Sequence, residues 1–254
     1  MLKSRIIPIM LWNGTTLVKG NRFENEKRSA GSPLTTIKIY NSRDVDEILF
    51  FDISRKNKVI DKDFMLSITD CVSVPITIGG GIENISQMSD LFEYGADKIS
   101  VNSIIFKNPN IIDESSKRFG SQAITVSIDV KKINNEYECY YNLGKTKSFR
   151  KLKDFLIECV DRGAGEIVIN SIEHDGLMKG YDNELIKYTS SLVNVPIVAS
   201  GGAGNYDHFY EAHKNGADAF AASSIYHFTE HTPAKAKKYL IKKGVSIREN
   251  FIIE

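Results

Sequence analysis

The chain has 254 residues, enough for one large domain or two small ones, and single α/β barrels commonly have this size. Its 42% hydrophobic and 26% charged residues are typical of a soluble globular protein, and a net charge of +1 gives no reason to expect nucleic-acid or membrane partners. The apolar runs have strand length, no secretion signal precedes them, and three scattered cysteines match neither a metal site nor a disulfide set. We therefore expect a cytoplasmic protein without metal or cofactor.

Short runs rich in β-branched residues alternate with amphipathic stretches of helical length. The expected strands are 5–11, 47–53, 75–79, 97–102, 123–129, 166–171, 196–200 and 218–223, and the expected helices lie near 33–45, 61–72, 84–94, 108–119, 150–163, 182–192, 205–215 and 232–243. Eight alternating units predict an α/β fold, a single (β/α)8 TIM barrel, and favour it over an open doubly wound sheet. Two longer connections, 12–31 and 131–149, interrupt the rhythm.

The chain also repeats itself. "VPITIGGGIENISQMSDLFEYGADKISVNS" at 74–103 matches "VPIVASGGAGNYDHFYEAHKNGADAFAASS" at 195–224 without a gap, at an offset of 121 residues. Because the offset is close to half the chain, we expect a barrel built from two duplicated half-barrels, approximately 1–120 and 121–254.

Each repeat carries a Gly-Gly pair after a buried strand, at the barrel end where active sites lie. Glycine allows backbone N–H groups to approach an anion closely. One expected phosphate cup consists of Gly81, Asn102 and Ser103, and the other of Gly202, Ser223 and Ser224. The alternative is that the glycines only form tight turns; two symmetry-related pairs favour a ligand with a phosphate at each end.

The chain resembles the cyclase subunit (HisF) of imidazole glycerol phosphate synthase over almost its full length. The resemblance rests on "RIIP", "LVKG", "GGGI", "GADKISVNS", "FGSQ", "SIDV", "GAGEI", "HDGLMKGYD", "VPIVASGGAG" and "IYHF". It implies a two-half barrel whose glutaminase partner (HisH-like) supplies ammonia, which attacks a bis-phosphate ribonucleotide. It also implies that the two cups hold this phosphorylated small molecule, together with Asn170 and Asp175, and that Lys19 helps to close over it.

The family pattern places one catalytic aspartate at the upper end of strand one and another at the upper end of strand five, as general acid and base. The repeat aligns Leu11 with Asp129, so the second aspartate is retained and its partner is absent. Asp175 and Glu173 follow strand six and are candidates to replace it, although neither lies on the required strand. Asp129 itself has a second interpretation, a structural acid bonded to backbone.

Charged residues are expected at the lower end of the barrel, where the strands begin. Alternation along a strand puts Arg5 on the same face as Leu11, about 20 Å below it at ~3.3 Å per residue. By the same count Lys98 and Glu166 also lie at this end, and Glu47 begins the second strand, so a ring of salt bridges can form there. The resemblance implies that these four residues are the gate through which ammonia enters from a glutaminase at the N-terminal face. The alternative is four solvated strand ends.

A retained gate beside a missing acid suggests a divergent branch associated with surface-polysaccharide pathways. On this interpretation the barrel conducts ammonia to a downstream sugar amidotransferase, which forms an acetamidino group. The alternative is an active cyclase subunit in histidine biosynthesis. A related bis-phosphate sugar isomerase is disfavoured because it needs both aspartates and has no use for the charged ring. His227 and His231 are four apart, but no third ligand is near enough to suggest zinc.

Overall fold

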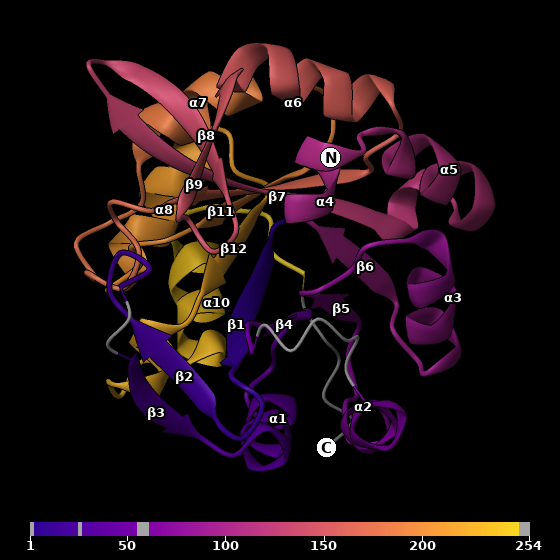
Figure 1. Cartoon of the computed structure of the whole chain (residues 1–254). Coiled ribbons are helices and arrows are strands. Elements are labelled where there is room, and N and C mark those ends of the chain that lie inside the picture. The colour runs from indigo at the N-terminus through magenta and orange to yellow at the C-terminus, as the bar shows by residue number, and fades with distance from the viewer. Residues whose placement is uncertain (1–2, 25–26, 55–60, 249–254) are drawn as a thin grey trace.

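The computed structural model describes residues 3–24, 27–54 and 61–248. Eight parallel strands in this part of the chain close into a barrel, and helices surround it (Figure 1). The barrel strands are β1 (Arg5–Trp12), β4 (Ile48–Asp52), β5 (Ile76–Gly79), β6 (Lys98–Val101), β7 (Ile124–Ile133), β10 (Glu166–Ser171), β11 (Ile197–Ser200) and β12 (Ala219–Ala222). The prediction of a (β/α)8 TIM barrel is confirmed.

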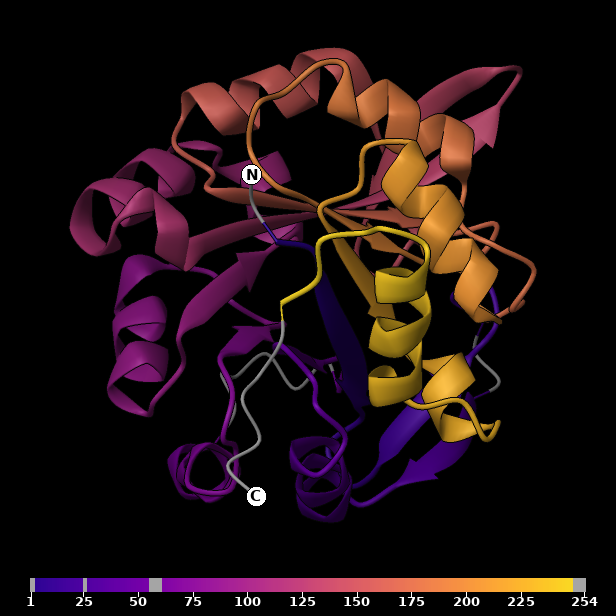
Figure 2. The same ribbon diagram turned by 180° about the vertical axis from the view of Figure 1, so that it is seen from behind.

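Eight longer helices connect these strands on the outside. They are α1 (Pro33–Asn41), α2 (Lys62–Thr69), α3 (Ile85–Glu93), α5 (Asn110–Phe119), α6 (Leu152–Asp161), α7 (Asn183–Ser190), α8 (Tyr206–Lys214) and α10 (Pro233–Lys242). Seen from behind, α10 packs beside β1, so the last helix covers the first strand (Figure 2). Every one of them lies within a helix expected from the sequence.

The two repeats adopt the same local structure. Asn84 caps α3 by accepting the N–H of Gln87, and Asn205 caps α8 by accepting the N–H of His208. The carboxylates of Asp97 and Asp218 accept the N–H groups of Ile76 and Ile197 at 2.8 and 2.9 Å. Because each pair is offset by 121 residues, the sequence repeat is also a repeat of hydrogen bonds.

The long connections contain secondary structure of their own. The connection after β1 forms a hairpin of β2 (Leu17–Gly20) and β3 (Lys27–Gly31), and the one after β7 forms β8 (Glu136–Tyr141) and β9 (Thr146–Lys151). Two short helices, α4 (Ser103–Lys107) and α9 (Ser224–His227), and a 3-10 turn, Ser121–Ala123, complete the described elements. Both hairpins extend from the upper, C-terminal end of the strands.

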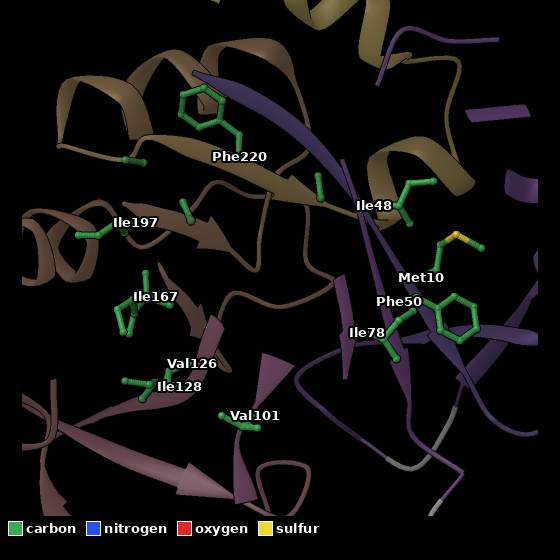
Figure 3. Close-up of a cluster of buried hydrophobic side chains, with 14 of the residues drawn as sticks. Met10, Ile48, Phe50, Ile78, Val101, Val126, Ile128, Ile167, Ile197 and Phe220 are labelled. Atoms are coloured by element: carbon green, nitrogen blue, oxygen red, sulfur yellow. The ribbon is translucent and has the colours of Figure 1, made fainter. Parts of the chain in front are cut away.

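Hydrophobic side chains form two layers. The outer layer fills the space between barrel and helices, with side chains such as Met10, Phe50 and Phe220 pointing away from the barrel axis (Figure 3). The inner layer lies within the barrel and consists of Ile7, Ile9, Leu49, Val168, Val198, Ala219 and Ala221. Alternation along each strand separates the layers, so inward positions of the strands are free to carry a site at either end.

Candidate active site and ionic ring

A cavity of about 660 Å³ opens at the C-terminal end of the barrel. Its floor is formed by inward residues of the strands, and its walls by the loops and hairpins that follow them. Its lining includes Leu11, Lys19, Phe51, Gly81, Ser100, Asn102, Ser103, Ser127, Asp129, Asn170, Asp175 and Ser200. Most of the side chains that the sequence assigns to the upper site therefore face one space.

Asp129 lies at the floor of this cavity and is almost completely buried. Its Oδ2 accepts the Asn102 amide at 2.8 Å, and its Oδ1 accepts the Asn170 amide at 3.1 Å. Burial raises the pKa of Asp129 to about 6, the two amides act against this rise, and Asp175 adds to it. A carboxyl with such a pKa can both accept and release a proton near neutral pH. The structural alternative, a carboxylate bonded to backbone, does not describe these contacts, since both are to side-chain amides.

Leu11 lines the same cavity and packs with Phe51 against the inner hydrophobic layer. These two residues pair in the β1–β4 register, as Asp129 and Asn170 pair in the β7–β10 register. One wall of the cavity is consequently apolar, while the wall formed by β6, β7 and β10 carries the acid and the amides. A site that uses two facing aspartates would instead carry a carboxylate on each wall.

Lys19 on β2 forms a buried ion pair with Asp175, Nζ to Oδ1 at 2.5 Å. The backbone N–H of Arg22 donates to the Asp175 carbonyl at 2.9 Å, which joins the β2–β3 hairpin to the loop after β10. The expected closing lysine therefore lies at the cavity rim, bound to a loop of the other half. Glu173, the other candidate to replace the missing acid, instead accepts the N–H of Lys132 at 3.0 Å.

The two glycine loops differ in their surroundings. Gly81, Asn102 and Ser103 line the cavity, and Asn102 Oδ1 is buried without a partner among the described residues. Gly202 and Ser224 are not part of the lining; Gly202 packs against the Gly180 carbonyl, which accounts for its lack of a side chain. In the second loop the Ser223 hydroxyl is also buried without a partner in the described ranges. Both loops thus keep an unused polar group at the start of a short helix.

The four charged residues at the lower end form a closed ring. The two terminal nitrogens of Arg5 contact Glu47 and Glu166, each at 2.6 Å. Lys98 contacts the second oxygen of each carboxylate, at 3.1 Å to Glu47 and 3.3 Å to Glu166. We call this set the ionic ring. Each carboxylate in it has two cationic partners, which is the arrangement that makes burial of charge tolerable.

Comparison of the sequence with known proteins shows which family the chain belongs to. The family model described as "Histidine biosynthesis protein" matches residues 5–232. An imidazole glycerol phosphate synthase subunit HisF from Chloroherpeton thalassium is 43% identical over 251 residues, which cover 98% of this chain and 100% of the relative. The chain belongs to the histidine biosynthesis protein family. Subunits with the same name from Chlorobaculum parvum and from a Thermotoga strain are 41% and 39% identical, each over 98% of this chain and 100% and 98% of the relative.

Several residues of this member of the histidine biosynthesis family enter the site without having been singled out in the sequence. Phe51 forms the apolar wall with Leu11, and Ser100 and Ser127 share a hydrogen bond of 2.8 Å below Asp129. The serines stand two positions before Asn102 and Asp129, so strand alternation alone could have found them. Identifying Phe51 as a site residue required the strand register, which pairs it with Leu11.

Two negative findings apply to the described residues. No group of three or more histidine, cysteine or acidic side chains is placed to hold a metal ion within residues 3–24, 27–54 and 61–248. Over the same ranges no helix has the length and apolar character needed to cross a bilayer.

Proposed function

We propose that this chain is the synthase subunit of a glutamine-dependent complex of the imidazole glycerol phosphate synthase type. In this proposal a glutaminase docks at the N-terminal face, ammonia enters through the ionic ring, and a phosphorylated ligand receives it in the upper cavity. One observation carries the proposal: a paired ionic ring and a cavity that holds a buried acid occupy opposite ends of one barrel interior, in a chain 43% identical to an imidazole glycerol phosphate synthase subunit.

The reaction that the relatives favour is formation of imidazole glycerol phosphate, since the three that are reported carry that name. Asp129 then exchanges protons with the reacting centre, because it is buried in the cavity and its pKa is raised to about 6. Gly81 with Ser103, in the cavity lining, holds one phosphate end, and Lys19 closes the cavity by its contact with the β10 loop. The other phosphate end is assigned to Gly202 and Ser224 from the sequence repeat alone, because both lie outside the lining. This assignment makes the histidine pathway the first candidate.

A second candidate rests on Leu11. A leucine exchanges no proton, and together with Phe51 it makes one wall of the cavity apolar. In this candidate the barrel passes ammonia to an acceptor on another enzyme and closes no imidazole ring. The sugar amidotransferase of surface-polysaccharide pathways suggested by the sequence is one such acceptor, but none of the reported relatives has a name connected with polysaccharides.

One experiment separates the two candidates. The purified chain is supplied with the bis-phosphate ribonucleotide and excess ammonium salt at pH 8.5, where more neutral ammonia is present, and imidazole glycerol phosphate is measured. Turnover that is lost in Asp129→Asn supports the histidine candidate. No turnover, together with stimulation of glutamine hydrolysis when the chain is added to a glutaminase, supports the ammonia-delivering candidate. If neither activity is found, the proposal is wrong.

A further inference from the structure

A chain of hydrogen bonds crosses three neighbouring strands at the floor of the cavity. The Ser200 hydroxyl on β11 donates to Asn170 Oδ1 at 3.1 Å, and Asn170 Nδ2 on β10 donates to Asp129 Oδ1 on β7 at 3.1 Å. The strand register pairs Asn170 with Asp129 on one side and with Ser200 on the other. The contacts are therefore fixed by the sheet and do not depend on a loop.

Ser200 determines which end of the Asn170 amide faces the acid. The oxygen and the nitrogen of a planar amide point in different directions, so a hydroxyl bonded to the oxygen leaves the N–H group directed at Asp129. Space for the amide oxygen comes from Gly201, where a Cβ would lie 2.7 Å from Asn170 Oδ1. This glycine of the second Gly-Gly pair thus has a role in the amide network.

The first half of the barrel has an apolar set in the corresponding places. Leu11, Phe51 and Gly79 replace Asp129, Asn170 and Ser200, and a Cβ at Gly79 would lie 2.7 Å from the Phe51 ring. One half of the mouth is thus arranged around a carboxylate, and the other around an aromatic ring. The hydrogen-bond chain is a specific feature of the second half.

We infer that Asn170 and Ser200 are positioning residues for Asp129: Ser200 orients the Asn170 amide, and that amide, with Asn102 on the other oxygen, fixes the carboxylate plane toward the cavity. Asn170 then acts through Asp129, in place of the phosphate contact expected from the sequence. The inference rests on the proposed function only where it assigns Asp129 a proton-transfer role, and its test does not require turnover.

The titratable groups around Asp129 define what the test measures. Asp175, which is paired with Lys19, raises the pKa of Asp129, and the two amides lower it. Cys139, on the neighbouring hairpin strand, has a thiol pKa raised to about 12, by burial first and by Asp129 to a lesser extent. The Cys139 thiol therefore stays neutral across the pH range in which Asp129 titrates. A rise in the Asp129 pKa after a substitution then reports the loss of an amide hydrogen bond.

The test is a pH titration of the Asp129 carboxyl in the full chain by carbon-13 NMR, with Asp129→Asn identifying its signal. Asn170→Leu keeps the size of the side chain and removes its hydrogen bonds, and we expect the pKa to rise by about one unit. Ser200→Ala removes one hydroxyl and frees the amide to turn, with an expected rise of about half a unit. Ser200→Thr, which keeps the hydroxyl, restores the value of the unmodified chain.

Ser100→Ala is the matched control, because its hydroxyl bonds Ser127 one layer below and should leave Asp129 unchanged. A Ser200→Ala chain that titrates like the unmodified one overturns the role of Ser200. An unchanged value in Asn170→Leu overturns the inference as a whole. If Asn170→Leu fails to fold, the Asp129 titration in Ser200→Ala tests the inference in its place, since that substitution deletes only a single oxygen atom.

Discussion

The ammonium group of Lys19 and the carboxylate of Asp175 lie 2.5 Å apart, although the two residues are 156 positions apart in the chain. Both side chains are almost completely buried, so their ion pair is protected from screening by salt. The pair joins the β2–β3 hairpin of the first half to the β10 loop of the second. The two halves thus each contribute one charge to a contact in the cavity wall.

Replacing Lys19 with Met should release this hairpin. The change leaves Asp175 buried without its cation, which is unfavourable, so the loops separate. We expect hydrogen exchange at the Arg22 amide, which donates to the Asp175 carbonyl, to become at least about tenfold faster, a change of ~1.4 kcal/mol. Lys132→Met, which breaks an exposed pair with Glu184, serves as the control and should not change that exchange rate.

Arg5→Ala tests the ionic ring. It leaves Glu47 and Glu166 with Lys98 as their common cation, and we expect the free energy of unfolding to fall by about 3–5 kcal/mol. In the complex with a glutaminase, product formation from glutamine should fall more than product formation from ammonium salt. Lys214→Ala breaks a surface pair with Glu211 and should cost at most about 0.5 kcal/mol. Equal losses with both nitrogen sources would argue against a role in ammonia entry.

Leu11→Asp tests whether the missing acid is the main defect. The new carboxyl enters a cavity that already holds Asp129, so a second proton-exchanging group faces the ligand. We expect ring closure of the bis-phosphate ribonucleotide with ammonium salt to increase by about tenfold or more. Leu11→Asn, which adds polarity without an acid, should give no gain. A gain with asparagine equal to that with aspartate would contradict the acid/base interpretation.

The raised pKa of Asp129 makes stability depend on pH. The pKa of this acid is higher in the folded chain than in the unfolded one, so its protonated form stabilises the fold. That contribution is complete below about pH 3.8 and is lost as the pH rises through about 6. Comparing urea unfolding at pH 4 and pH 7, Asp129→Asn should remove up to roughly 3 kcal/mol of pH dependence. Asp154→Asn, at an exposed position, should keep the pH dependence of the unmodified chain.

Two glycine substitutions separate backbone strain from crowding. Gly202 and Gly244 both have positive φ angles, +115° and +81°, but a Cβ at Gly202 would lie 2.0 Å from the Gly180 carbonyl oxygen, whereas none of the described atoms lies within 4 Å at Gly244. Thermal unfolding of Gly244→Ala should show a loss of about 1 kcal/mol from strain alone. Gly202→Ala should lose about 2–4 kcal/mol. Equal losses of unfolding free energy would mean that the loop after β10 moves aside for the new Cβ atom at no cost in stability.

Much of this architecture could be predicted from the sequence, because the barrel strands and outer helices have a strong hydrophobic period and clear end signals. The hairpin strands β3 and β9 were not predicted, because "KRSAG" and "TKSFRK" have no apolar alternation and form only against a neighbouring strand. In the site, parity along the strands placed Arg5, Lys98 and Glu166 at one end of the barrel, and the family resemblance favoured a ring with Glu47 over solvated strand ends. The convergence of two amides on Asp129 was not predictable, because it depends on the register between strands and on side-chain rotamers.

The ionic ring also sets a condition on passage through the barrel. Opening the ring is unfavourable, because moving Arg5 aside leaves two buried carboxylates to share one lysine. The Arg5 Nε–H group is buried and has no acceptor among the described residues, so it does not add to the ring. Under the proposed function, passage through the lower end of the barrel therefore requires that both ion pairs of Arg5 break first.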